Sequence, residues 1–466
     1  MKKYFLAVAS FFIYSHISLG QVYPGQMDST FVPVRSHHYD PELTFDFCVN
    51  EPAWSNQAGI HSAFGSTDRL YFRKEVPVNH DNDLSSSYST AVWRGERANA
   101  QILVWSSEAL EQVRVSTQDL RSAEGNIIPK DRITFELVRY VLSNYPYAEK
   151  KAICGESPYK SGFLMPDRFE TLDRFDLPSQ TTRPVWMMVD VPRGTAPGTY
   201  KGKVEVRAKG KAPQLLNLEI VVQNQLLPYP KDWKYRLDLW QNPWAVAWYN
   251  HVEPWSPEHK MLLKQHLKHY ADAGGTYITT YGVHSPWSDN SYMIEGGMIE
   301  WIKKADGTWA FDYKIFDEYV ELAMECGINE AITLYTPIPW GFRHRYKDEA
   351  TGDYSYINWA PSSEEFKKMW NIFLTDFKFH LEAKSWLDIT YIGINENPME
   401  ETLAAINVVR NHDKCWKITY AGNWHKELDG LLDDYSFLYG EEPTIAEQKA
   451  RAATGRTSVS YTHLTL

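Results

Sequence analysis

The stretch Leu387–His412, LDITYIGINENPMEETLAAINVVRNH, decides the fold of the second half of the chain. Its first eight residues are mostly apolar or β-branched, which favours a buried strand, and its last fourteen have the apolar spacing of a helix. Between them the apolar run stops at Asn395 and Glu396, and Pro398 precedes the helix. The stretch therefore predicts a strand–helix unit that places an amide and a carboxyl group at the end of a strand.

Strands and helices alternate on both sides of this unit. Because such alternation is typical of a parallel sheet, the pattern predicts an incomplete (β/α)8 TIM-type barrel over residues 226–466, which we expect to be truncated at its C-terminal end. A doubly wound sheet is the alternative, but no glycine-rich phosphate loop follows the first strand. The predicted strands are Tyr235–Trp240, Thr276–Gly282, Glu330–Thr336, Leu387–Ile394, Trp416–Gly422, Asp433–Tyr439 and the start of a seventh at Thr457. The predicted helices are Ser256–Gly275, Phe311–Gly327, Ser362–Lys384, Met399–His412, His425–Gly430 and Thr444–Ala453.

The first half of the chain has a different pattern. Short apolar runs separated by glycine and proline turns predict an N-terminal β-sandwich domain over residues 21–225. The stretch Gln223–Trp233 contains two prolines, which disfavour both a helix interior and a central strand, and it is expected to be the linker. The predicted strands include Ala100–Ser107, Pro184–Pro192, Tyr200–Ala208 and Leu215–Val222.

The N-terminus has the pattern of a secretory signal peptide over residues 1–20. Lys2 and Lys3 precede an apolar run, and Ser18 and Gly20 are small residues suited to cleavage before Gln21. The chain is therefore expected to be secreted or periplasmic. No cysteine stands at the cleavage point, so a lipid anchor is not indicated.

Charge and composition narrow the class of partner. The net charge of −11 is spread without a basic block, which argues against nucleic acid and anionic membrane surfaces. No later run reaches the ~18 apolar residues of a membrane span. The 18 Trp and 29 Tyr suit both core packing and stacking on sugar rings. Among the four cysteines, Cys326 and Cys415 are expected to be buried thiols, and a bridge between Cys48 and Cys154 stays open.

The candidate substrate-binding residues follow the predicted barrel strands, where barrel active sites lie. Aromatic rings and amides suit an uncharged polyhydroxylated ring, although each aromatic residue has core packing as an equal alternative. The sequence contains no metal-ligand cluster, nucleophilic serine or cysteine motif, or phosphate loop, so no cofactor is expected. The candidates are Trp240, Gln241, Asn242, His284, Trp287, Tyr335, Trp340, Asn423 and Tyr439.

The catalytic candidates are Glu396 and Asn395. Glycosidases normally use two carboxyl groups, and this strand end supplies one. In one mechanism Glu396 is the acid/base and a nucleophilic carboxylate comes from strand seven. In the other, the substrate's 2-acetamido oxygen attacks the anomeric carbon, Glu396 protonates the leaving oxygen, and Asn395 orients the acetamido group.

The chain resembles glycoside hydrolase family 123, the β-N-acetylgalactosaminidases. The resemblance is carried in order by AVWRGERANAQILVWSS (91–107), RPVWMMVDVPRGTAPGTYKGKVEV (183–206), LDLWQNPWAVAWYNHVEPWSPEH (237–259), GTWAFDYKIFDEYVELAMECGI (307–328) and TYIGINENPMEE (390–401). It implies a β-sandwich followed by a catalytic barrel, and an exo-acting, substrate-assisted release of β-linked N-acetylgalactosamine from glycans. It also implies that Glu396 is the acid/base.

One residue departs from the family pattern. The family has Asp-Glu before Pro-Met-Glu, and here Pro398, Met399 and Glu400 match while Asn395 replaces the aspartate. A neutral amide brings no charge to the developing oxazolinium, which lowers the rate by ~10²-fold where such stabilisation matters. A related substrate-assisted family of endo-acting glucosaminidases carries an asparagine in this role. A retaining glycosidase with a strand-seven nucleophile and a glycan-binding pseudoenzyme remain the alternatives.

Overall fold

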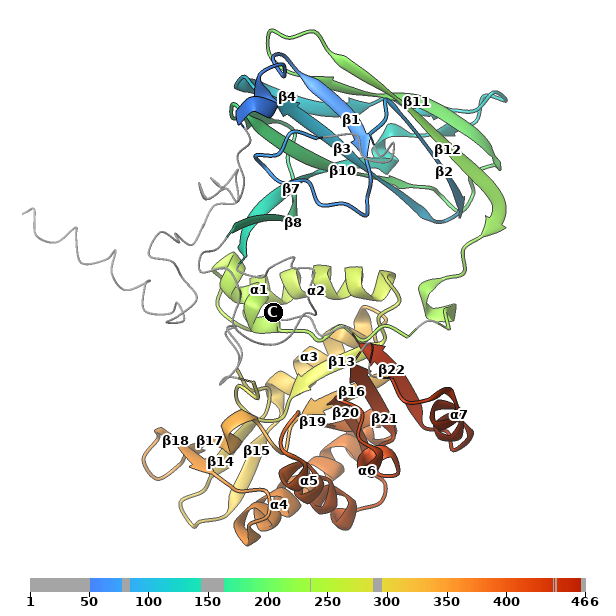
Figure 1. The fold of residues 1–466 in the computed structure, drawn as a ribbon. Coiled ribbons are helices and arrows are strands. Elements are labelled where there is room, and N and C mark those ends of the chain that lie inside the picture. Colours follow the sequence, from blue (N-terminus) through green and yellow to red (C-terminus); the bar gives the residue numbers. More distant parts are fainter. Residues whose placement is uncertain are drawn as a thin grey trace, which may run out of the picture. The chain divides into compact units, whose positions relative to one another are not determined.

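The structure is a computed structural model that describes residues 51–77, 84–143, 163–234, 236–287, 296–438, 440 and 442–461. The chain divides into two compact units, Met1–Pro228 and Tyr229–Leu466, each with its own apolar core (Figure 1). The predicted signal peptide and the pair Cys48 and Cys154 lie outside the described residues.

The first unit is β-rich, as predicted, and its strands form two sheets. One sheet has the order β1-β3-β10-β7-β8, and the other runs β2-β12-β11-β4-β9 with β5 and β6 beside β11. Pairing is antiparallel except between β12 and β2. The strands are β1 His61–Gly65, β2 Ser87–Arg94, β3 Arg97–Ser106, β4 Leu110–Thr117, β5 Leu120–Arg121, β6 Ile127–Ile128, β7 Ile133–Ser143, β8 Phe163–Thr171, β9 Phe175–Leu177, β10 Thr181–Asp190, β11 Gly198–Arg207 and β12 Gln214–Leu226.

The two sheets contribute to one core because apolar residues alternate along their strands. On β12, Leu216, Leu218 and Ile220 are buried while the residues between them are less so, which is the period-two pattern of a strand with one covered face. They join Ile102 of β3 and Val189 of β10 in the same cluster. The predicted strands of this half correspond to β3, β10, β11 and β12, and β12 continues into the stretch that was predicted to be linker.

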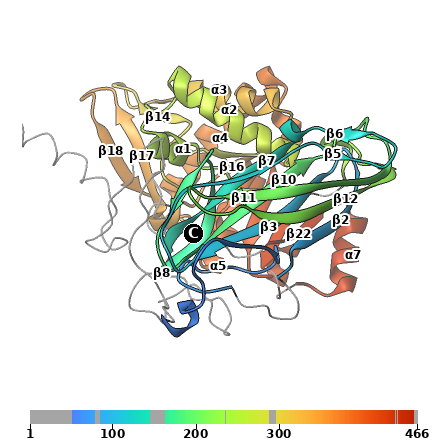
Figure 2. The ribbon, with the colours of Figure 1, turned by 90° about the horizontal axis from the view of Figure 1, so that it is seen from above.

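The second unit is α/β, as predicted, and its main sheet is parallel. Six strands lie in chain order, each hydrogen-bonded to the next. They are β13 Tyr277–Tyr281, β16 Ala331–Tyr335, β19 Thr390–Ile394, β20 Lys417–Gly422, β21 Asp434–Leu438 and β22 Thr457–Tyr461. The helices are α1 Pro243–Asn250, α2 Pro257–Asp272, α3 Lys314–Glu325, α4 Glu364–Lys384, α5 Met399–His412, α6 Lys426–Asp429 and α7 Ile445–Ala453. Figure 2 shows this unit from a second direction.

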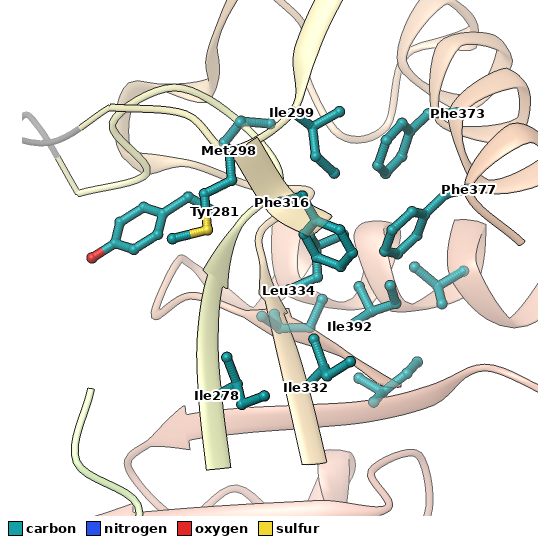
Figure 3. Packing of buried hydrophobic residues seen from close by; sticks show 14 of the residues in the cluster. Ile278, Tyr281, Met298, Ile299, Phe316, Ile332, Leu334, Phe373, Phe377 and Ile392 are labelled. Atoms are coloured by element: carbon teal, nitrogen blue, oxygen red, sulfur yellow. The ribbon is translucent and has the colours of Figure 1, made fainter. Parts of the chain in front are cut away.

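One face of the parallel sheet packs against helices. Ile278, Ile332 and Ile392 are fully buried on β13, β16 and β19, and Figure 3 shows them in the cluster that contains Phe316 of α3 and Phe373 of α4. Strands covered by helices become nearly continuous apolar runs, which explains why their sequences are so readily recognised.

Helix starts are set by local chemistry. Ser256 caps α2 by accepting a hydrogen bond from the His259 backbone N–H, and Pro257 occupies the first helical position. Ser363 caps α4 in the same way, and Thr444 forms a capping box at α7. These residues mark the helix starts in the sequence, so their predicted positions are close to the observed ones.

The opposite face of the sheet holds a buried ion pair near the beginnings of the strands. Arg236 donates two hydrogen bonds to Asp434 of β21, at 2.7 and 2.5 Å, and its guanidinium lies 4.3 Å from the ring centre of Tyr277. Burial and the Asp434 carboxylate raise the pKa of Asp238 to about 7, against the effect of Arg236. The pair connects the segment before β13 to β21, the fourth strand after β13 in the sheet.

One predicted strand was wrong, and one predicted helix begins later than predicted. Of the predicted strand Tyr235–Trp240, the described residues form only a single parallel bridge from Leu237 to Gly275, since this edge segment has a partner on one side only. Tyr235 lies outside the described residues. The predicted helix at Phe311 begins instead at Lys314, because the residues before it belong to a hairpin.

The hairpin belongs to a four-stranded sheet that the sequence reading missed. Its order is β15-β14-β17-β18, and its strands are β14 Glu300–Lys303, β15 Trp309–Asp312, β17 Arg343–Asp348 and β18 Tyr354–Asn358. Trp301 and His344 pack from it into the core of the second unit. The alternating pattern and the Asp-Gly turn at 306–307 were the sequence indications for it.

No described helix is long and apolar enough to cross a membrane. Cys326 is buried, as predicted, but Cys415 is exposed, contrary to the prediction. Cys415 directly follows the turn after α5, where the chain has not yet entered β20, so no layer covers it.

Candidate active site

An aromatic cluster lies where β13 and β16 end. Trp240 stacks on Trp287 with ring centres 5.7 Å apart, and Tyr335 contacts both rings at 5.3 and 5.0 Å. Tyr335 is buried, whereas Trp240 is 49% exposed and presents a flat apolar face to solvent. Three predicted residues that are far apart in the sequence therefore meet at the carboxyl ends of neighbouring strands, and their exposed part suits the C–H face of a sugar.

Asn395 lies next to this cluster, on the same face of the sheet. Gly393 shares that face two residues earlier, and a Cβ there would lie 2.8 Å from the Tyr335 ring, so the ring packs directly on the β19 backbone. Asn395 is 3% exposed, and its Nδ2 donates to the Pro286 carbonyl at 3.2 Å. Its Oδ1 is buried and accepts no hydrogen bond from the described residues.

Trp340 presents a second buried polar atom at the same place. Its backbone N–H donates to the same Pro286 carbonyl at 3.0 Å, while its indole Nε1–H is buried and has no acceptor among the described residues. Buried polar atoms are nearly always hydrogen-bonded, and an unsatisfied one costs about 1–3 kcal/mol. Among the described residues, one acceptor and one donor thus stay unsatisfied on two side chains whose residues share one carbonyl partner, and an amide group has the N–H and the C=O that would serve them.

Glu396 is exposed at the end of β19 and lies beside Tyr420 of the neighbouring strand β20. A Cβ on Gly422 would be 2.7 Å from Glu396 Oε1 and 2.6 Å from the Tyr420 hydroxyl, so both groups occupy the space over this glycine. Burial and the nearby Glu396 carboxylate raise the pKa of Tyr420, which keeps its hydroxyl protonated. The carboxyl group is thus reachable from solvent and has a phenol near it.

Gln241 and Asn242 use their side chains within the fold. Gln241 Oε1 accepts from the Thr279 backbone N–H at 2.8 Å, and its Nε2 donates to the carbonyls of Leu239 and Tyr277. Asn242 Oδ1 accepts from the Ala245 backbone N–H at 3.2 Å and caps α1. Both amides position the segment that carries Trp240.

The remaining predicted residues are spread around the strand ends. His284 follows β13 and is half-buried; burial and the nearby Arg345 and Arg343 lower its pKa to about 4, so its imidazole is neutral at neutral pH. Asn423 follows β20, is exposed, and accepts a hydrogen bond from Tyr435 through its backbone carbonyl. Tyr439 lies outside the described residues.

Sequence reasoning missed Tyr420 and Pro286. Tyr420 reads as a core residue of a strand, and only its place two residues before a strand-end glycine distinguishes it. Pro286 acts through its backbone carbonyl, for which no sequence pattern exists. Among the described residues, no group of three or more His, Cys, Asp or Glu side chains is placed to hold a metal ion.

The chain matches two family descriptions. Residues 240–465 match "Glycoside hydrolase 123, catalytic domain", and residues 64–208 match "Glycoside hydrolase 123 N-terminal domain". Comparison with curated proteins finds no match.

One solved structure has a similar fold over most of this chain. A family 123 glycoside hydrolase from Clostridium perfringens, described in connection with glycolipid glycan hydrolysis, has a TM-score of 0.74 and 24% identity, over 87% of this chain and 72% of its own. A PapD-like domain of human CEP192 has 12% identity over 40% of this chain and 99% of its own, but its TM-score of 0.17 supports no inference.

Proposed function

Because the chain belongs to glycoside hydrolase family 123, whose members act on glycans, we propose that it removes terminal β-linked N-acetylgalactosamine by substrate-assisted catalysis. The observation that carries this proposal is the buried Oδ1 of Asn395, which has no hydrogen-bond partner among the described residues and lies next to the aromatic cluster of Trp240 and Tyr335. An acetamido group has an N–H for that oxygen and a separate carbonyl for the Trp340 donor, whereas a 2-hydroxyl has a single oxygen atom to serve both.

The proposed reaction has two steps. The acetamido oxygen attacks the anomeric carbon while Glu396 gives its proton to the leaving oxygen, so the glycosidic bond breaks and an oxazolinium forms. The Glu396 carboxylate then takes a proton from a water molecule that adds to the anomeric carbon, which regenerates the acetamido group with retained configuration. Asn395 holds the N–H, and the Trp340 indole donates toward the acetamido oxygen.

This site is proposed to lie in a (β/α)8 barrel, of which six parallel strands are described. The signal-peptide pattern of residues 1–20 supports a secreted or periplasmic enzyme. The alternative mechanism places a nucleophilic carboxylate after β22, and residues 462–466 there lie outside those described.

A matched pair of substrates tests the function. The full chain is assayed on an aryl β-N-acetylgalactosaminide and on the corresponding aryl β-galactoside, which differ only at the 2-substituent. Turnover of the first alone is expected. Equal turnover of both favours a strand-seven nucleophile, and binding of the first without turnover favours the pseudoenzyme alternative.

Replacing Asn395 by aspartate should raise kcat by roughly tenfold, because a carboxylate stabilises the oxazolinium more than the neutral ground state. A GalNAc-thiazoline, which mimics the intermediate, should inhibit both forms and bind the Asp variant more tightly. Asn395→Ala is the companion variant: it loses the acceptor and should lower both kcat and thiazoline affinity. If the thiazoline inhibits none of the three proteins, substrate assistance is wrong here.

Gly422→Ala should lower kcat/KM by about 10²-fold, because its methyl group would displace Glu396 or Tyr420 by an ångström or more. The control is Gly430→Ala in the same unit, where nothing lies within 4 Å of the added Cβ and the backbone φ is −75°. Steady-state kinetics and a melting curve are measured for both. Equal kinetic losses in the two variants would contradict the placement of Glu396.

A further inference from the structure

The hairpin β17–β18 has an inner and an outer face. On the inner face, His344 and Tyr346 are buried against the core of the second unit. On the outer face, Arg343 and Tyr356 are exposed and Arg345 is half-buried, so the face has both charge and aromatic surface.

The outer face is ordered by two cation–π contacts. The Arg343 guanidinium lies 3.8 Å from the ring centre of Tyr356, and that of Arg345 lies 4.2 Å from the ring centre of Tyr354. The two rings are 47% and 50% exposed. Each arginine thus lies over a tyrosine at the diagonal position of the partner strand.

Carboxylates neutralise this face only in part. Glu300 of β14 lies 3.9 Å from Arg345 and accepts a hydrogen bond from the Tyr354 hydroxyl at 2.9 Å. Arg343 forms no ion pair with the described residues. The outer face also carries Lys347, which follows Arg345 by two residues on β17. It further carries Asp312 of β15, which is the strand partner of Glu300.

The face is adjacent to the candidate active site. Trp340, whose indole N–H is the buried donor described above, lies three residues before Arg343 in the same turn. Both arginines act electrostatically on His284, which follows β13 at the strand ends. A glycan whose terminal sugar occupies the strand ends and whose next residues extend along β17–β18 would bring those residues to the guanidinium groups.

We propose that the outer face of β17–β18, through Arg343 and Arg345, binds an anionic substituent, a carboxylate or a sulfate, on the glycan next to the cleaved sugar. This inference rests on the proposed function for the position of that sugar. A guanidinium pairs with planar or tetrahedral oxyanions through two parallel hydrogen bonds, and the exposed tyrosines contact the ring that carries the anion.

Three hydrolysis-resistant disaccharides test the proposal. Each has β-N-acetylgalactosamine joined through sulfur to position 4 of a methyl glycoside of glucose, glucuronic acid or 6-O-sulfoglucose. Binding to the full chain is measured by calorimetry at two salt concentrations. The glucuronic or the sulfated ligand should bind about tenfold more tightly than the neutral one, and the advantage should shrink at high salt. Preference for one anion identifies which group the face accepts.

Variants separate specific binding from general charge. Arg343→Gln should reduce the ratio of anionic to neutral ligand affinity to near one. Arg343→Lys should keep part of this ratio, because lysine keeps the positive charge but lacks the two parallel N–H donors of the guanidinium. Lys347→Gln, the matched control on the same strand, should keep the full ratio. Equal affinity of the three ligands, no measurable binding of the anionic ones, or an equal loss in Lys347→Gln overturns the proposal. Because binding needs no turnover, the aryl glycoside assay tests the proposed function separately.

Discussion

Replacing Glu396 by glutamine should lower kcat/KM for substrates with poor leaving groups by about 10³-fold. The amide has no proton to give, and general acid–base catalysis contributes about 10²–10⁴-fold. The loss should be much smaller for a dinitrophenyl glycoside, whose leaving group needs no protonation, so the first step then depends on the acetamido group alone. The measurement is kcat/KM over a series of aryl leaving groups of increasing pKa.

The control is Glu400→Gln, which changes another exposed glutamate in the first turn of α5. It should leave the dependence on the leaving group unchanged. An equal loss for all leaving groups in Glu396→Gln would contradict an acid/base role, and it would assign Glu396 to substrate binding instead.

Asp434→Ala should destabilise the second unit by about 3 kcal/mol or more. The Asp434 side chain is 4% exposed and that of Arg236 is 17% exposed, so removing the carboxylate leaves a guanidinium buried without its partner. Asp238 compensates only in part, because burial is the largest influence on its pKa and opposes ionisation of its carboxyl group. The change in the free energy of unfolding is measured by chemical denaturation, from the unfolding transition of the second unit.

Glu325→Ala is the control for this ion pair. Glu325 pairs with Lys264 at 2.9 Å, but the two side chains are 61% and 56% exposed, and such pairs contribute about 0–1 kcal/mol. A small effect in Asp434→Ala, equal to that of the control, would mean that water reaches Arg236 and that the pair does not hold the sheet.

Local chemistry made most of the second unit predictable. The strands β13, β16, β19 and β20 are nearly continuous apolar runs because both of their faces are buried, and that burial is visible in the sequence. Capping residues such as Ser256 mark the helix starts in the sequence, because the capping side chain accepts a hydrogen bond from backbone only a few residues away. The segment Tyr235–Trp240 was wrongly predicted to be a strand, because its apolar alternation does not reveal that it lies at the edge of the sheet.

The sequence by itself determined the two-part β and α/β organisation, the family, and the presence of Asn395 next to Glu396 at a strand end. Each of these follows from residues that are close together in the chain or from motifs that occur in a fixed order along it. Only the tertiary structure decided which side chains are left for a ligand. The side chains of Gln241 and Asn242 hydrogen-bond to nearby backbone. Asn395 and Trp340 both contact the carbonyl of Pro286, and each keeps a buried side-chain atom that has no hydrogen-bond partner among the described residues. Whether a polar group is satisfied depends on partners distant in sequence, so no local pattern records it.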